Sequence, residues 1–133
     1  MEAELRNVVR QRAENRCEYC RLLHHDADLV AFHVEHIVAK QHGGTDALSN
    51  LALACSRCNR TKGPNLSSLG PATGQMARLF HPRQDSWDAH FEFQGATIVR
   101  LTPEGRATVE LLKMNEPKRM RTRTTLIARG QLG

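Results

Sequence analysis

Two CxxC pairs, Cys17/Cys20 and Cys55/Cys58, set the strongest limit on how this chain can fold. Two intervening residues let both thiolates of a pair turn toward one ion, and two such pairs complete a tetrahedral structural zinc site. Thirty-four residues separate Cys20 from Cys55, more than the roughly 15 to 20 of a plain zinc ribbon. The spacing therefore predicts a structural Zn²⁺ held by all four cysteines, with a further segment inserted between the pairs.

Disulfide bonds or reduced, buried thiols are the alternatives for these cysteines. The chain starts with MEAELRNVV, which is acidic and amphipathic, unlike a secretion signal. No apolar run approaches the roughly 18 residues of a membrane helix. We therefore expect a cytoplasmic protein that does not associate with a membrane, in a compartment that keeps thiols reduced.

The positive charge of the chain is concentrated at one end. Its 133 residues have a formal net charge of +5, and residues 113–133 contain six Lys or Arg against one acidic residue. Residues 1–112 hold 13 of each sign. A basic C-terminal arm suits an acidic partner such as nucleic acid, although a solvated helix or a disordered tail has the same composition.

The inserted segment has the pattern of a small hairpin followed by a helix. Residues 2–14 predict an amphipathic helix before the first cysteine pair, with Leu5, Val8 and Val9 on one side. Residues 29–39, LVAFHVEHIVA, predict a strand that breaks near Glu35 and His36. Residues 55–62 predict a short helix that ends at Gly63-Pro64. These elements make a two-strand, one-helix unit whose two ends are held together by the zinc site.

The rest of the chain predicts a second layer of structure. Residues 65–75 are rich in Ser, Gly and Pro and predict a surface loop, whereas residues 91–101 predict a hairpin that turns near Gln94-Gly95. Thr102 and Pro103 predict the start of a helix that runs to about Met114, and Pro117 the start of a basic helix. We expect an α+β protein with a core at 1–65 and an extension at 66–133 packed on the same domain.

Several short motifs occur in a fixed order between Cys17 and Gly63. They are CEYC, VEHI, HGG, SNL and CSRCNRTKG. In order and spacing they resemble the HNH nuclease family, in its bacterial form with a four-cysteine zinc. The resemblance implies a ββα-metal core and a divalent-metal-dependent endonuclease that hydrolyses phosphodiester bonds in DNA.

Hydrolysis of a phosphodiester needs a base to activate water and a cation to stabilise negative charge in the transition state. His36 is the natural base, because imidazole exchanges protons near neutral pH, and the resemblance gives it the same role. By resemblance, Glu35 and Asn59 bind the catalytic ion, and their hard oxygen ligands favour Mg²⁺ or Mn²⁺. The family more often has Asp and His at these two positions, which leaves the metal preference open.

Two further residues of the motif have more than one interpretation. By resemblance, Asn50 pins a loop and orients His36, but asparagine before a helix is also an ordinary cap or turn residue. His33 shares a strand face with Glu35 and could contact the metal, position a phosphate or pack against the sheet. His24 and His25 could bind a metal, but an exposed loop explains them as well.

Basic residues outside the motif are the candidates for contact with the DNA backbone. They are Lys62 near the end of the short helix and Arg119, Arg121 and Arg123 in the C-terminal arm. The chain has no recognition-helix pattern, so we expect low sequence specificity. We expect no small-molecule cofactor, and the oligomeric state stays open.

The alternative function is a non-catalytic, zinc-ribbon-like module that binds nucleic acid or acts as an adaptor. Such a module has no need for Glu35-His36, Asn50 and Asn59 in this register. Their presence favours the enzyme, although resemblance in fold does not by itself establish an activity.

Overall fold

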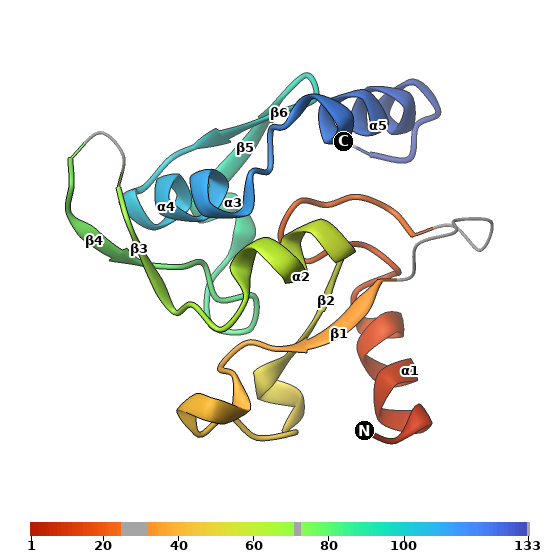
Figure 1. The fold of residues 1–133 in the computed structure, drawn as a ribbon. Helices are drawn as coiled ribbons and strands as arrows, with labels where there is room; N and C mark the ends of the chain where they lie inside the picture. Colours follow the sequence, from red (N-terminus) through yellow and green to blue (C-terminus); the bar gives the residue numbers. More distant parts are fainter. Residues whose placement is uncertain (25–31, 71–72, 133) are drawn as a thin grey trace. The chain divides into compact units, whose positions relative to one another are not determined.

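The computed structural model of the protein describes residues 1–24, 32–70 and 73–132 (Figure 1). They form helices and two-stranded antiparallel sheets, so the predicted α+β class is correct. The chain divides into two compact units, Met1–Pro64 and Asn65–Gly133. Among the described residues, no helix combines the length and the apolar character needed to cross a membrane.

The first unit contains the two-strand, one-helix arrangement that the sequence predicts. Its elements are α1 (Ala3–Arg12), β1 (His33–His36), the 3-10 helices η1 (Lys40–His42) and η2 (Leu48–Asn50), β2 (Leu51–Ala54) and α2 (Ser56–Lys62). Strands β1 and β2 pair antiparallel, with Glu35 opposite Ala52. Every residue of β2 is buried, so this strand forms the centre of the unit.

Helix α2 follows β2 after a single residue, Cys55, which caps it. The Cys55 sulfur accepts a hydrogen bond from the backbone N–H of Cys58 at 3.4 Å, so two of the four cysteines are fixed by the first turn of the helix. Gly63 follows the helix with φ of +52°, a conformation that side chains disfavour. The predicted end of this helix is therefore confirmed.

Strand β1 is shorter than the predicted strand over residues 29–39. It begins at His33 and ends at His36, and residues 29–31 lie outside the described residues. After His36 the backbone leaves β2, because Ile37 donates its N–H to the carbonyl of Asn50 and Val38 donates to the side chain of Asn50. The predicted break therefore falls directly after His36, and Glu35 stays within the strand.

Helix α1 lies within the predicted range but buries less than its sequence pattern indicated. Val9 is fully buried, whereas Val8 is 44% exposed and Leu5 is partly exposed. Polar contacts complete its attachment, since the guanidinium of Arg12 donates to the carbonyls of Leu48 at 3.0 Å and Leu51 at 2.6 Å. The helix is thus fastened to the start of β2.

The second unit contains more strands than predicted. Its elements are β3 (Ser67–Leu69), β4 (Met76–Arg78), α3 (Trp87–His90), β5 (Phe91–Gln94), β6 (Thr97–Arg100), α4 (Pro103–Leu112) and α5 (Pro117–Ala128). The hairpin β5–β6, the Thr102 cap and both proline-initiated helices were predicted. The prediction of a loop over 65–75 was wrong, because β3 pairs with β4 through backbone hydrogen bonds that Ser- and Gly-rich composition does not reveal.

Aromatic side chains and two arginines hold the second unit together. The ring of Phe91 packs against Phe80 and Trp87, with centroids 5.2 Å and 5.1 Å apart respectively. Arg123 is fully buried on α5 and donates to the carbonyls of Ala96 and Met114, both at 2.7 Å. Buried Arg119 donates to the carbonyls of Leu112 and Lys113, where α4 ends. These arginines satisfy carbonyls after the end of α4, which lack intrahelical partners, and in the turn between β5 and β6.

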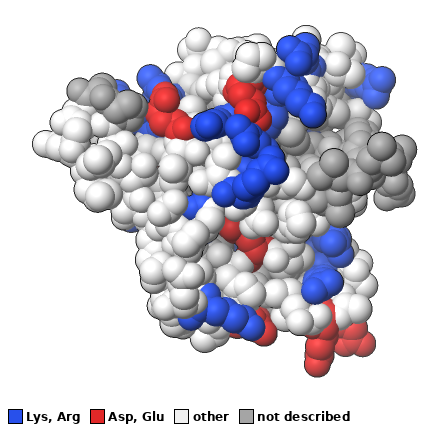
Figure 2. Space-filling view, viewed as in Figure 1, with Lys and Arg blue, Asp and Glu red and all other residues white. Residues whose placement is uncertain are grey.

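The outward side of α5 is basic. Lys118, Arg121 and Arg129 are exposed there, and no acidic residue occurs after Glu116. Figure 2 shows Lys and Arg side chains gathered over the region of α5. One helix therefore uses its basic residues in two ways, with arginines inside the unit and cations facing solvent.

Candidate active site and metal centre

The four cysteines converge on one buried point of the first unit. Their ligand sulfurs all lie within 4.8 Å of one another. The Sγ atoms of Cys20 and Cys55 are 3.7 Å apart, too far for a disulfide bond of about 2.05 Å. The predicted convergence is therefore confirmed, and these residues are positioned to bind a metal ion.

The chemistry of this cluster fits zinc. Burial raises the pKa of the Cys17 and Cys58 thiols well above the usual range, because a site without water disfavours thiolate. A hydrogen bond with Cys17 lowers the pKa of Cys55. A soft divalent cation is what would stabilise four thiolates here, and a complete set of four protein ligands leaves no open position for catalysis.

The first cysteine pair docks onto the hairpin through the two residues between its cysteines. Glu18 and Leu53 exchange two hydrogen bonds: the Glu18 N–H donates to the Leu53 carbonyl at 2.9 Å, and the Leu53 N–H donates to Glu18 Oε2 at 2.7 Å. The buried hydroxyl of Tyr19 donates to Oε1 of Glu35 on β1. The segment Cys17–Cys20 therefore contacts both strands.

Glu35 is a buried carboxylate with two different partners. It is 5% exposed, Tyr19 binds one carboxylate oxygen, and Nζ of Lys62 lies 3.6 Å from the other. Burial raises the pKa of Glu35, and the charge of Lys62 and the Tyr19 hydrogen bond act in the opposite direction. A carboxylate offers about four lone-pair positions, so two partners leave room for a metal ion.

Lys62 lies inside the unit, contrary to the prediction that it contacts nucleic acid. Only 2% of it is exposed, and its ammonium group donates to the carbonyl of Ile37 at 3.0 Å besides facing Glu35. Its last-turn position on α2 turns the side chain toward β1. The buried carboxylate accounts for a buried lysine at this position, since a buried charge needs an opposite charge nearby.

His36 is held by an acidic partner that sequence reasoning did not assign to the site. Nε2 of His36 lies 2.7 Å from Oδ1 of Asp46, and Nζ of Lys40 lies 3.6 Å from the same oxygen. The hydrogen bond with His36 lowers the pKa of Asp46. A carboxylate oxygen accepts hydrogen bonds, so this contact favours the tautomer with the proton on Nε2.

Asn50 closes the loop between the two strands. Its Oδ1 accepts from the Val38 N–H at 2.8 Å, while its Nδ2 donates to the carbonyls of Val38 at 3.0 Å and Thr45 at 2.8 Å. Gly44 fits beneath this amide, because a Cβ there would lie 1.7 Å from the Val38 carbonyl oxygen and 2.9 Å from Asn50 Nδ2. Both interpretations of Asn50, as a loop pin and as a turn residue, describe the same three hydrogen bonds.

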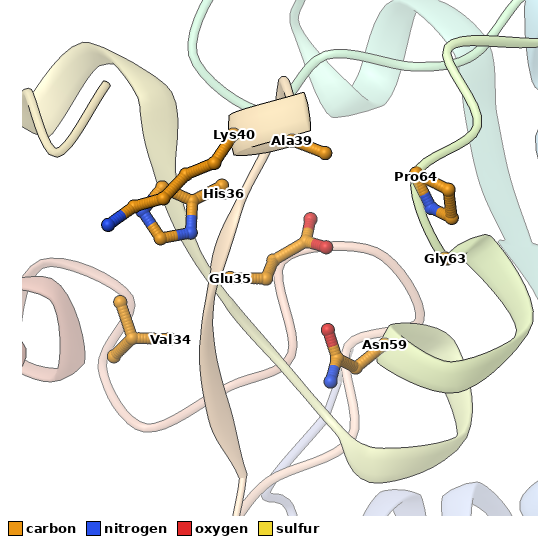
Figure 3. Close-up of a pocket in the computed structure, with 8 residues that line it drawn as sticks. All are labelled: Val34, Glu35, His36, Ala39, Lys40, Asn59, Gly63 and Pro64. Atoms are coloured by element: carbon orange, nitrogen blue, oxygen red, sulfur yellow. The ribbon is translucent and has the colours of Figure 1, made fainter. Parts of the chain in front are cut away.

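A pocket of about 420 Å³ brings the motif residues together at the surface of this unit. Its lining comes from β1, the start of η1 and the end of α2, and consists of Val34, Glu35, His36, Ala39, Lys40, Asn59, Gly63 and Pro64. The side chains of Glu35 and Asn59 extend toward one another from β1 and α2 (Figure 3). A carboxylate and an amide facing one space are suitable ligands for Mg²⁺ or Mn²⁺.

The remaining predicted site residues lie elsewhere. His33 is exposed on β1, its Nε2 is 3.3 Å from the Ser56 hydroxyl, and it is not part of the pocket lining. His24 stacks on Phe32 with ring centroids 4.8 Å apart, and His25 lies outside the described residues. Among the described residues, the four-cysteine cluster contains no histidine, so His24 is not part of it.

The predicted nucleic-acid contacts on α5 need correction at two of three positions. Arg119 is 4% exposed and Arg123 is 0% exposed, so both guanidinium groups are used within the second unit. Arg121 is exposed and stays a candidate, together with its neighbours Lys118 and Arg129. Sequence reasoning missed this division because it counted charges without the helical period that places residues 119 and 123 on one face.

Comparison with known protein families identifies the segment that carries the pocket and the cysteines. The family model described as HNH endonuclease matches residues 17–65. The resemblance to HNH nucleases is therefore confirmed for this segment, which lies almost entirely within the first unit. Searches of curated proteins and of solved structures give no match.

Proposed function

We propose that the protein is a divalent-metal-dependent HNH endonuclease that hydrolyses phosphodiester bonds in DNA. The observation that carries this proposal is the pocket in which Glu35, His36 and Asn59 meet, within a segment that matches the HNH endonuclease family. A purely structural or adaptor module would not need a histidine, a carboxylate and an amide around one open space.

His36 is the proposed general base. With a proton kept on Nε2 by Asp46 at 2.7 Å, Nδ1 accepts a proton from the attacking water. Asn50 acts through the backbone, because its hydrogen bonds hold the loop from Val38 to Thr45, and Asp46 follows directly. The base is thus oriented by two residues that do not touch the substrate.

Glu35 and Asn59 are the proposed protein ligands of Mg²⁺ or Mn²⁺. When bound, such an ion stabilises negative charge on the phosphate and the leaving oxygen. The protein has to keep Glu35 ionised despite its burial, and Lys62 supplies a positive charge 3.6 Å away for this. It also has to direct the remaining lone pairs of Glu35 into the pocket. By resemblance to the family, the products carry 5′-phosphate and 3′-hydroxyl ends.

The four-cysteine site is proposed to hold structural Zn²⁺. It joins the segment before β1 to the first turn of α2, so it fixes both ends of the stretch that carries the catalytic residues. The exposed cations of α5 are proposed to contact DNA phosphates without reading the sequence, because such contacts position a protein but do not distinguish bases.

Nicking of supercoiled plasmid by the zinc-loaded full chain tests the proposal. We expect nicking that requires Mg²⁺ or Mn²⁺ and falls by about 10² to 10⁴-fold in His36→Ala. His42→Ala is the matched control, since His42 is exposed in η1 and does not line the pocket. Zinc content is measured in every sample, so that loss of the catalytic ion is not confused with loss of the structural one.

Two results would contradict the proposal in different ways. Intact plasmid with the wild-type chain in either metal would favour the non-catalytic nucleic-acid-binding module. Nicking that persists in His36→Ala would keep the nuclease and reject His36 as its base.

A further inference from the structure

We propose that Tyr19 is a positioning residue for the active site: from within the first cysteine pair, it holds the carboxylate of Glu35 in the orientation that binds the catalytic ion. The inference rests on the proposed function and adds a residue that neither the motif nor the family match assigns. As a consequence, the hydrogen bond from Tyr19 to Glu35 links the segment that carries the first cysteine pair to the catalytic site.

The position of Tyr19 makes this role specific. It stands between Cys17 and Cys20, is 0% exposed, and its hydroxyl donates to Oε1 of Glu35. A phenylalanine would fill the same apolar space, but a buried hydroxyl requires a partner. A partner here is the carboxylate of Glu35, which lines the pocket.

The two oxygens of Glu35 are constrained by different parts of the first unit. Tyr19 binds Oε1 from the Cys17–Cys20 segment, and Lys62 approaches Oε2 to 3.6 Å from α2. Two partners in different directions fix the rotation of the carboxylate about its last bond. The lone pairs that remain then have a fixed direction, which a metal ion with strict geometry such as Mg²⁺ requires.

The backbone around Tyr19 is itself immobilised. Cys17 and Cys20 are held in the cysteine cluster, and Glu18 exchanges two hydrogen bonds with Leu53 of β2. Tyr19 therefore cannot withdraw from Glu35 unless the cysteine pair opens or leaves the hairpin. Order at the cysteine cluster is transmitted to the pocket by this side chain.

A fluorine label tests the contact without replacing any residue. Tyr19 is the only tyrosine and Trp87 the only tryptophan of the chain. Full-length, zinc-loaded protein grown with 3-fluorotyrosine gives a single fluorine resonance, which we expect to move as Mg²⁺ is added. Protein grown with 5-fluorotryptophan is the matched control in the second unit, and its resonance should stay in place. Glu35→Gln should abolish the movement of the Tyr19 signal.

Substitution tests the consequence for metal affinity. We expect Tyr19→Phe to retain zinc and to bind Mn²⁺ about tenfold more weakly, the usual size of effect when the hydrogen-bond partner of a ligand is lost. Thr108→Val is the matched control, because Thr108 is also fully buried and its hydroxyl accepts from the Phe80 N–H at 2.8 Å in the second unit. Its Mn²⁺ affinity should equal that of the wild type.

The outcomes separate this inference from the function on which it rests. Wild-type protein that binds Mn²⁺, with Tyr19→Phe binding equally well, overturns the inference alone. Wild-type protein that binds neither Mn²⁺ nor Mg²⁺ overturns the metal-dependent function and the inference with it. Should Tyr19→Phe fail to fold, the fluorine titration still decides, since a Tyr19 resonance unmoved by Mg²⁺ at concentrations that support nicking rejects the role.

Discussion

The two units of this protein bury charged side chains for different purposes. In the first unit the buried charges are of both signs: Glu18, Glu35 and Lys62 lie around the hairpin. In the second unit the buried charges among the described residues are the two arginines of α5, and they donate chiefly to backbone carbonyls. The first arrangement surrounds a buried carboxylate, whereas the second satisfies backbone carbonyls.

The difference extends to how each unit is stabilised. The second unit has a cluster of aromatic rings, Phe80, Trp87, Phe91 and Phe93, and needs no metal to explain its core. The first unit has a short, fully buried strand and four buried cysteines in place of such a cluster. We therefore expect metal to be essential to the fold of one unit and irrelevant to that of the other.

The largest expected effect comes from removing a cysteine ligand. Cys55→Ser should unfold the first unit, because a structural zinc site contributes on the order of 10 kcal/mol to folding. Amide hydrogen exchange should show loss of protection in β1 and β2, while β5 and β6 keep theirs. Protection of β1 in the variant would show that the cysteines are dispensable, and loss of protection in both units would show that the second depends on the first.

An intermediate effect is expected when the two kinds of buried cation are compared directly. Lys62→Met should cost the first unit about 3 to 5 kcal/mol, because it leaves the Glu35 carboxylate buried without its counter-charge. Arg123→Met should cost the second unit only about 1 to 3 kcal/mol, because the carbonyls of Ala96 and Met114 that lose a donor are neutral. Urea unfolding followed at fluorinated Tyr19 and Trp87 measures each unit separately.

A double variant sharpens this comparison. Glu35→Gln combined with Lys62→Met should recover much of the lost stability, because both charges are then absent. Equal costs for Lys62→Met and Arg123→Met, or no recovery in the double variant, would mean that Lys62 acts by packing its stem rather than by balancing a charge.

The smallest expected effect is a dependence on pH confined to the second unit. Asp85 receives both guanidinium nitrogens of Arg78, at 2.6 and 3.0 Å, and this contact lowers the pKa of Asp85. Stability from the pair is therefore present above the unfolded pKa of about 3.9 and is lost as pH falls through the lower folded value. Because Arg78 is half exposed, less than about 1 kcal/mol is at stake.

Asp85→Asn isolates this contribution. As the pH is lowered from 5, the urea midpoint reported by Trp87 should fall more steeply in the wild type than in the variant. Identical slopes would show that the Arg78 contact adds nothing to the acid stability of this unit.

Sequence reasoning succeeded where the signal is local. Each confirmed prediction depends on a few adjacent residues: the CxxC spacing, the cap at Thr102, and the prolines that start α4 and α5. The signals that were missed depend on distant partners. Asp46 reaches His36 only because the intervening loop closes, and Arg123 bonds to Ala96, 27 residues earlier. Sequence reasoning assigned no role to Tyr19, because its partner Glu35 lies 16 residues further on.

The loop that Asn50 closes keeps its shape independently of the residues at its tip. Its three hydrogen bonds join Val38, Thr45 and the start of β2 into a ring that does not involve the side chains of Gln41 and His42 at the tip. Those two residues are exposed and directly follow Lys40, which lines the pocket, in the sequence. Changes at the tip, His42→Ala among them, should therefore leave the backbone that positions His36 beside the pocket unaltered, so this end of the loop can vary in sequence at little cost to the rest of the unit.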